Sequence, residues 1–365
     1  MDEPPSTPDR PHYIRVVILE GQANVKLSVK GGYQLLALDT DEMLLEGKTI
    51  RRAACTAMPH GLILGRHTFS LSGFRIHPLG ASPVYVNSKA YRGDMDIVRQ
   101  ADKTITVINR VDLEEYLKGV LRAEVSPWWP LEALKAQAVT ARTFALYQQR
   151  QNGHKAYDVT ANVASQLYGG MSMERRRTSR AVNETRGIVL MEGGVIFPAF
   201  YHACCGGHTE DASRLWNITA GPLKGVSCRF CGRSPYSFWH YKTTLQGIVR
   251  RLEESGYPVT GSRSIHTGPA DDSGRLQELY LDTAQDKTVR IPAKNFREIM
   301  GDRGIKSTRF QIKVSGDTVF FEGRGWGHGV GLCQWGAFGM AQEGRTYEEI
   351  LQHYYAGAEL VRMEN

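Results

Sequence analysis

The chain has 365 residues, of which 41% are hydrophobic, so it can bury the cores of about two domains and does not have the composition of a disordered protein. No stretch reaches the roughly 18 consecutive apolar residues that a membrane-spanning helix needs, so none is expected in this chain. The 45 basic side chains exceed the 38 acidic ones, giving a net charge of +7. This modest excess is compatible with an anionic polymer as partner, but no basic stripe or known motif indicates nucleic-acid binding.

Two segments precede the first expected helix. Residues 1–11 are polar and rich in proline, which predicts a disordered tether, and they lack the apolar stretch of a secretion signal. Residues 12–110 contain short β-prone runs separated by Gly, Pro and Asn-Ser turns, and predict an N-terminal β-rich part.

A change of hydrophobic period after residue 110 predicts a pair of helices. Apolar residues at 113, 116, 117, 120 and 121 follow the i, i+3, i+4, i+7 pattern of a helix that ends near Glu124, with Asp112 as its N-cap. The breaker VSPWWP follows, and Pro130 can begin a second helix that continues to about residue 150.

The remainder of the chain alternates strand-like runs with helices expected over 243–256, 293–301 and 346–357. We expect residues 111–365 to form one core, with 241–315 as a second subdomain or an insertion. The mixed order predicts an α+β fold, rich in β-structure, in which the helix pair and a second strand-rich subdomain form a central groove.

Glu124 is the first candidate for chemistry. At the C-terminal end of a helix the macrodipole is negative and disfavours a carboxylate, and Trp128 and Trp129 are expected to exclude water nearby. Both effects favour a neutral carboxylic acid, which is what a catalytic proton donor requires. The alternative is a solvent-facing glutamate at a frayed helix end.

Other polar residues could surround such an acid. Lys135 and Arg142 are seven residues apart on the second helix, so they align on one edge and could bind sugar or carboxylate oxygens. Gln166 and Tyr168 could present hydrogen-bonding groups to a glycan. Ordinary surface cations and an ordinary turn are the alternatives for these two pairs.

The segment 323–344 is rich in glycine and also contains Trp326, His328 and Gln334. Glycines allow close approach of a backbone, and tryptophan faces stack on pyranose rings. The segment lacks the GxxxxGK[ST] pattern of a phosphate loop, so we interpret it as part of a sugar groove.

A CxxH followed by a CxxC some twenty residues later has the ligand types and spacing of a structural zinc site. Four protein ligands would close the tetrahedron, which leaves no position for a catalytic water. A disulfide such as Cys205 to Cys231 is the alternative, while Cys55 and Cys333 are interpreted as small core residues. The predicted ligands are Cys205, His208, Cys228 and Cys231.

Four separated blocks resemble the stage II sporulation protein D family, which includes the domain of the amidase enhancer. They are NRVDLEEYLKGVLRAEVSPWWPLEALKAQAVTARTFAL, DVTANVASQLYGG, FYHACCGGHTE and FEGRGWGHGVGLCQWGAFGMAQEG, in the order of the family. The resemblance identifies residues 111–365 as the catalytic core of the family.

The resemblance implies a lytic transglycosylase that acts on peptidoglycan glycan strands stripped of stem peptides. Glu124 matches the catalytic glutamate of the family, and Lys135 and Arg142 match positions implicated in function. Gln166, Tyr168, Trp326, His328 and Gln334 are placed around the groove as substrate-binding residues. No cofactor is required for this chemistry, and Asp158 or Glu210 would be needed as a second carboxylate only in a hydrolase.

The alternative is a non-catalytic module that binds peptidoglycan or enhances an amidase. Both readings imply glycan strands as partner, a cell-wall amidase or envelope complex as a further partner, and a place in the cell envelope or outside the cytoplasm.

Overall fold

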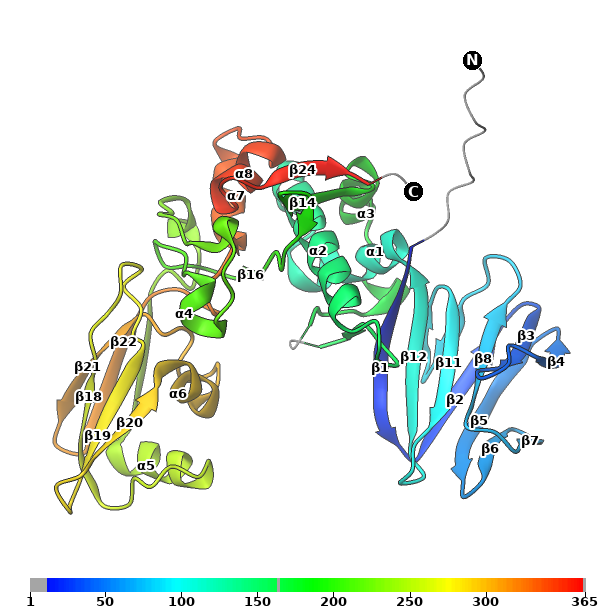
Figure 1. The fold of residues 1–365 in the computed structure, drawn as a ribbon, viewed down its shortest axis with the longest axis horizontal. Coiled ribbons are helices and arrows are strands. Elements are labelled where there is room, and N and C mark those ends of the chain that lie inside the picture. Colours follow the sequence, from blue (N-terminus) through cyan, green and yellow to red (C-terminus); the bar gives the residue numbers. More distant parts are fainter. Residues whose placement is uncertain (1–11, 163–164, 364–365) are drawn as a thin grey trace. The chain divides into compact units, whose positions relative to one another are not determined.

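The computed structural model describes residues 12–162 and 165–363, so the tether expected at 1–11 lies outside the described residues. The chain divides into two compact units (Figure 1): unit 1 consists of Met1–Val189 and Val361–Asn365, and unit 2 of Leu190–Leu360. Both units combine helices and strands, which confirms the predicted α+β class. Within the described residues, no helix is both long enough and apolar enough to cross a membrane.

Unit 1 begins with two antiparallel sheets. One has the order β13-β1-β12-β11-β8-β3-β4, in which only β13 pairs in parallel, and the other has the order β10-β9-β2-β5-β6-β7. Alternate residues such as Val25, Leu27 and Val29 of β2 are buried, as expected for strands with one face on a core. The strands are β1 (Tyr13–Gln22), β2 (Asn24–Val29), β3 (Tyr33–Ala37), β4 (Met43–Gly47), β5 (Ile50–Met58), β6 (Gly61–Leu64), β7 (His67–Phe69), β8 (Gly73–Pro78), β9 (Val84–Val86), β10 (Lys89–Tyr91), β11 (Asp94–Arg99), β12 (Ile105–Asp112) and β13 (Val159–Thr160).

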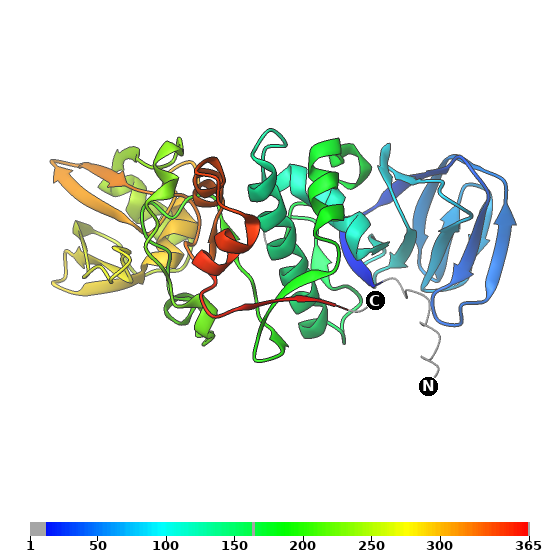
Figure 2. The ribbon, with the colours of Figure 1, turned by 90° about the horizontal axis from the view of Figure 1, so that it is seen from above.

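Three helices complete unit 1 and pack against one another (Figures 1 and 2). The Asp112 side chain caps α1 by accepting from the backbone N–H groups of Glu114 and Glu115, as the sequence predicted. The third helix was not predicted. The helices are α1 (Leu113–Glu124), α2 (Leu131–Gln151) and α3 (Arg176–Glu184), with a short 3₁₀ turn, η1 (Gly170–Met173).

Unit 2 contains two three-stranded sheets, β17-β22-β21 and β18-β19-β20, and a parallel pair, β16 with β23. A further small sheet has the order β15-β14-β24, and the boundary between the two units falls within β14 and within β24, at residues 189–190 and 360–361. The elements are β14 (Ile188–Glu192), β15 (Val195–Ile196), β16 (Tyr201–His202), α4 (Ala212–Trp216), η2 (Gly221–Leu223), η3 (Phe230–Arg233), β17 (Trp239–Thr244), α5 (Leu245–Glu254), β18 (Ser262–Thr267), β19 (Glu278–Thr283), β20 (Thr288–Pro292), α6 (Ala293–Met300), β21 (Phe310–Ser315), β22 (Thr318–Gly323), β23 (Leu332–Cys333), α7 (Gln334–Gln342), α8 (Tyr347–Tyr354) and β24 (Glu359–Arg362).

One hydrophobic core holds the two three-stranded sheets together with α5 and α6. It extends along the chain from Trp239 to Phe321 and includes Leu252 of α5 and Phe296 of α6. This segment overlaps the subdomain expected over 241–315. The division between the two units, however, falls near residue 190 and not at residue 110.

Candidate catalytic carboxyl and candidate metal centre

Glu124 is the last residue of α1, where the sequence placed it. Its side chain is partly exposed, and Oε1 accepts a hydrogen bond of 2.8 Å from the backbone N–H of Leu167. The helix stops here because Val125 adopts an extended conformation. Glu124 is therefore a partly exposed residue at the end of its helix, and a main-chain donor from another segment holds its carboxyl group.

Gln166 and Tyr168 flank Leu167 and are both buried, at 0% and 8% exposure. The amide of Gln166 accepts from the Tyr116 hydroxyl at 3.1 Å and donates to the Ala141 carbonyl at 3.2 Å. The Tyr168 hydroxyl donates to Asn109 at 2.8 Å. These side chains thus fix the segment that holds Glu124, and their predicted contact with a substrate stays a prediction.

Tyr116 donates a hydrogen bond to Gln166 and is close enough to Glu124 for that charge to act on its pKa. Burial, together with the charges of Tyr168 and Glu124, raises the pKa of Tyr116 well above its ordinary value. The phenol therefore stays protonated and remains a donor to Gln166. Its ring packs against that of Tyr168, with centroids 5.0 Å apart.

Arg142 and Lys135 both face α3, in agreement with their predicted alignment, but in different surroundings. Arg142 is fully buried, pairs with Glu114 at 2.6 Å and donates to the carbonyls of Val182 and Ile188. It lies in the core, and its predicted role in binding substrate stays a prediction. Lys135 is partly exposed and lies 2.9 Å from each of two carboxylates, those of Glu132 and Glu184.

The two tryptophans after Glu124 differ from expectation. Trp128 is 83% exposed, so the prediction that it excludes water from Glu124 is wrong, while Trp129 is partly buried. Arg177 of α3 fixes the intervening backbone by donating to the carbonyls of Pro127 at 3.0 Å and Trp129 at 2.9 Å.

The two candidates for a second carboxylate are both engaged elsewhere. Asp158 is buried and pairs with Arg15 at 2.6 Å. Glu210 belongs to unit 2 and is buried beside Asp271, and burial followed by this neighbour raises its pKa to about 7. Burial also acts on Asp271, but hydrogen bonds led by that from Ser273 outweigh it and lower its pKa to about 2. Glu210 therefore holds the proton of this pair.

The glycine-rich segment of unit 2 packs on the backbone between Phe200 and Cys205. Gly325 and Gly329 have φ of 82° and 92°, which disfavours other residues. A Cβ at Gly325 would lie 2.6 Å from the Cys204 carbonyl oxygen, and one at Gly329 would lie 2.4 Å from the Arg275 guanidinium carbon. Close packing inside the protein therefore accounts for these glycines, and the proposed sugar contact is not needed to explain them.

The three groove candidates of this segment are at least partly buried. Trp326 packs on Tyr236 with ring centroids 4.3 Å apart, and Gln334 begins α7 with 7% exposure. His328 Nε2 faces the Tyr201 carbonyl at 2.9 Å while its Nδ1 accepts from Val330. Burial first, then Arg297, lowers the pKa of His328 to about 3, so the ring is neutral. A groove joining these residues to Glu124 of unit 1 stays a prediction.

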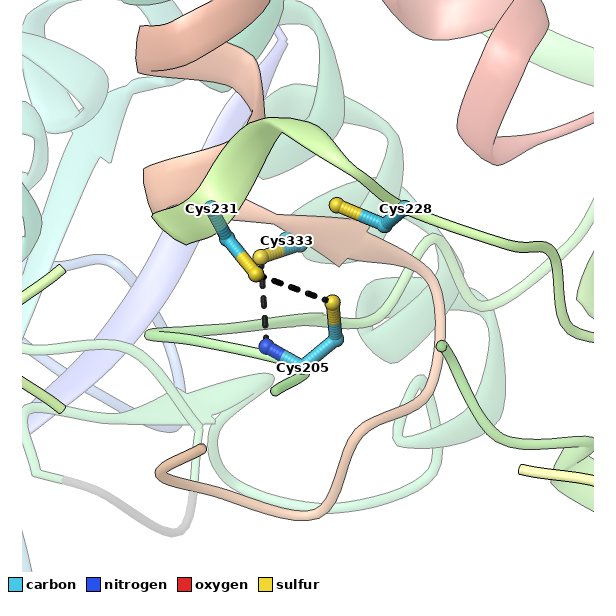
Figure 3. A group of neighbouring side chains, drawn as sticks. All are labelled: Cys205, Cys228, Cys231 and Cys333. Carbon is cyan, nitrogen blue, oxygen red and sulfur yellow. Dashed lines mark hydrogen bonds between the residues drawn. The ribbon is translucent and has the colours of Figure 1, made fainter. Parts of the chain in front are cut away.

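Four buried cysteines of unit 2 form a candidate metal centre (Figure 3). Their Sγ atoms all lie within 4.8 Å of one another, and those of Cys205 and Cys231 are 3.6 Å apart. Ligands about 2.3 Å from a tetrahedral zinc ion lie about 3.8 Å from each other, so this spacing suits a shared ion and is too long for a disulfide. The group is Cys205, Cys228, Cys231 and Cys333.

The structure differs from the expected ligand set at one position. Cys333, interpreted from the sequence as a core residue, takes the place of His208, whose Nδ1 instead faces the Thr209 carbonyl at 2.7 Å. Cys333 is brought to the group because β23 pairs in parallel with β16, which precedes Cys205 in the chain. No spacing rule links residues so far apart in sequence.

Backbone donors surround the sulfur atoms. The N–H of Cys205 and that of Gly336 lie 3.2 and 3.3 Å from Cys333 Sγ, and the N–H of Gly207 lies 3.4 Å from Cys205 Sγ. Hydrogen bonds from neighbouring thiols, Cys204 first, lower the pKa of Cys231, whereas hydrogen bonds to Cys228 and Cys231 raise the pKa of Cys205 and burial raises that of Cys333. Such donors stabilise thiolates, the form that binds metals.

Comparisons with known proteins identify relatives of this chain. A family model described as stage II sporulation protein matches residues 101–191. An uncharacterized protein of Brachyspira hyodysenteriae is 30% identical over 95% of this chain and 92% of its own length. Stage II sporulation protein D of Bacillus subtilis is 28% identical over 74% of this chain and 80% of its own length. The chain belongs to the stage II sporulation protein D family.

Another relative in this family is the amidase enhancer of Bacillus subtilis. It is 30% identical over 67% of this chain. The matched region covers 40% of the length of the amidase enhancer. Membership of the stage II sporulation protein D family, together with this likeness, supports a role related to the cell wall.

Proposed function

We propose that the protein is a peptidoglycan lytic transglycosylase in which Glu124 acts first as acid and then as base. The observation that carries the proposal is Glu124, a partly exposed residue at the end of α1 whose carboxyl group is oriented by the Leu167 N–H. Family membership supports the same residue, since it lies within the segment that the family model matches.

Glu124 protonates the glycosidic oxygen between MurNAc and GlcNAc as the bond to C1 of MurNAc breaks, and GlcNAc leaves as an alcohol. The carboxylate then accepts the proton of the MurNAc C6 hydroxyl, whose oxygen bonds to C1. The product is a 1,6-anhydroMurNAc end, and no water is consumed. The intramolecular hydroxyl has a high effective molarity and so outcompetes water.

A single carboxylate suffices for this route, whereas a two-carboxylate hydrolase needs a partner across the bond. The unit 1 candidate for that partner, Asp158, is occupied by Arg15. This ion pair favours the lytic route. Gln166 and Tyr168 act as positioning residues because they fix the backbone donor to Glu124.

We propose in addition that Cys205, Cys228, Cys231 and Cys333 bind a structural Zn²⁺. Four thiolates close the coordination sphere and tie the segments that carry them to the start of α7. The chemistry at Glu124 does not require this ion. We place the protein in the cell envelope, with glycan strands as substrate and a cell-wall amidase or envelope complex as further partner.

The test is to incubate the purified protein with glycan strands stripped of stem peptides and to identify the fragments by mass spectrometry. We expect anhydro ends from the wild type and a loss of about 10²- to 10⁴-fold in rate for Glu124→Gln. Glu20→Gln, the same change at an exposed residue of β1, is the matched control. Reducing ends would indicate a hydrolase, and no fragments would indicate a non-catalytic binding or amidase-enhancing module.

A further inference from the structure

Two arginines of unit 2, Arg275 and Arg309, lie beside the loop that begins at Cys205, and the proposals above give them no role. Arg275 donates from Nη2 to the Cys205 carbonyl at 2.9 Å and from Nη1 to the His208 carbonyl at 2.8 Å. Arg309 donates from Nη1 to the Gly206 carbonyl at 2.8 Å. The two guanidinium groups thus hold the backbone of the loop that carries one cysteine of the candidate metal centre.

Glycines leave the space that these guanidinium groups occupy. A Cβ at Gly329 would lie 2.4 Å from Arg275 Cζ. A Cβ at Gly207 would lie 3.1 Å from Arg309 Nη1, and one at Gly274 would lie 3.0 Å from Arg309 Nε. The three glycines have positive φ values of 92°, 121° and 77°, which other residues rarely adopt. The backbone is therefore shaped around two cations at fixed positions.

Arg275 is a buried cation without an adjacent anion. It is 0% exposed, and within residues 12–162 and 165–363 it has no carboxylate at ion-pair distance and no hydrogen-bond partner for Nε. Asp271 accepts the Arg275 backbone N–H but forms its ion pair with Arg214, at 3.2 Å. Glu210 is close enough to interact with the charge of Arg275, but it also lies beyond ion-pair distance. Carbonyl oxygens offset only part of the cost of burying a charge, so a further source of negative charge is expected nearby.

The cysteine group drawn in Figure 3 can supply that negative charge. Burial, then the neighbouring cations Arg275 and Arg324, lower the pKa of Arg309, whereas the charges of Cys205 and Cys231 raise it. Arg309 is therefore close enough to both cysteines to interact with their charges. Four thiolates around a divalent ion leave two negative charges uncompensated, and two guanidinium groups carry the two opposite charges.

We propose that Arg275 and Arg309 compensate the charge of the zinc tetrathiolate and thereby keep all four cysteines bound as thiolates. This inference rests on the proposed zinc site, because it assigns the residues that make that site electrically neutral. Hydrogen bonds to the Cys205, Gly206 and His208 carbonyls hold the two cations in place. Protonation of one thiolate would leave positive charge in excess beside the site, so the arginines favour the fully coordinated state.

The experiment measures the zinc affinity of the full chain by competition with a chromophoric chelator. Arg309→Lys retains the charge and a donor, Arg309→Gln retains a donor alone, and Arg309→Met retains neither. We expect Arg309→Lys to bind zinc within about threefold of the wild type, and the other two variants to bind about tenfold more weakly, because each loses the charge. Arg250→Gln removes the charge of an exposed side chain of α5 and should leave the affinity unchanged.

Arg275→Gln removes the second cation and should also weaken zinc binding about tenfold. Because Arg275 is fully buried, circular dichroism must show that this variant is folded, and the partly exposed Arg309 tests the idea independently. Wild-type affinity in Arg309→Gln, whether or not Arg309→Met is weakened, would overturn charge compensation and leave the zinc site standing. A wild-type protein that does not bind zinc would overturn the metal site itself, and this inference with it.

Discussion

The surroundings of Glu124 in unit 1 and the cysteine centre of unit 2 are built in opposite ways. In unit 1 one partly exposed carboxyl group is supported by buried neighbours, and the support reaches it through a backbone N–H. In unit 2 the four side chains of interest are themselves buried and come from three segments of the chain. In unit 1 buried neighbours hold the backbone donor to a partly exposed side chain, whereas in unit 2 the buried thiols bring three segments of the chain together.

The largest effect is expected at the cysteine centre. Cys333→Ser removes one of the four proposed ligands. The zinc proposed for this site should therefore be lost, and the thermal midpoint of unfolding should fall by more than about 10 °C, because metal binding contributes to folding. Elemental analysis and calorimetry measure the two effects. Cys55→Ser changes a buried cysteine of β5 outside the group and should retain the metal, as should His208→Ala. Full metal content in Cys333→Ser would refute the four-cysteine site.

The next largest expected effect is a difference in stability between variants of the buried Arg142 and the partly exposed Lys135, both on α2. Arg142→Gln leaves Glu114 buried without its partner, so the free energy of unfolding should fall by about 3–5 kcal/mol. Lys135→Gln on the same helix breaks a more exposed pair and should cost about 1 kcal/mol or less. Chemical denaturation gives both values. Similar values for the two variants would contradict the core position of Arg142.

A third test uses the pH dependence of unit 2. The folded-state pKa of Glu210, about 7, lies above its ordinary value of 4.5, so protonation stabilises the folded state. That stabilisation is complete below about pH 4.5 and is lost as the pH rises through 7, by about 3 kcal/mol. Glu210→Gln should flatten this part of the stability profile. The same slope in wild type and variant would assign the effect to another group.

The smallest effect distinguishes positioning from catalysis in unit 1. Tyr168→Phe removes only the hydroxyl that donates to Asn109, so stability should fall by about 1 kcal/mol. If Tyr168 only positions the Leu167 N–H, kcat should fall several-fold while KM stays unchanged. A rise in KM alone would instead indicate direct substrate contact, as the sequence analysis first expected.

Local patterns were sufficient to predict some of these features. The capped helix that ends at Glu124 follows from the spacing of apolar residues and from Asp112, all within one short segment. The CxxC pair of the metal centre is likewise visible in the sequence. The α+β class and the helices at α2, α5, α6 and α8 were predicted for the same reason.

Features that depend on distant contacts were not predicted. Nothing local to Cys333 indicates that β23 pairs with β16. The sequence around Gln166 likewise does not indicate whether its amide contacts a glycan or the Ala141 carbonyl. The helix α7 was not predicted because its segment contains glycines, which are poor helix formers. In the structure, a Cβ at Gly336 would clash with Tyr354 and one at Gly339 with Phe230. Tertiary packing therefore requires glycine at both positions, although glycine disfavours a helix.

The donor that holds Glu124 has a consequence for how the sequence can vary. Because the Leu167 N–H belongs to the main chain, replacing the side chain at this position leaves the donor in place. Only proline lacks the hydrogen, so a proline there would release the carboxyl while every other residue retains its anchor. Substitutions at position 167 other than proline therefore retain the backbone hydrogen bond to Glu124.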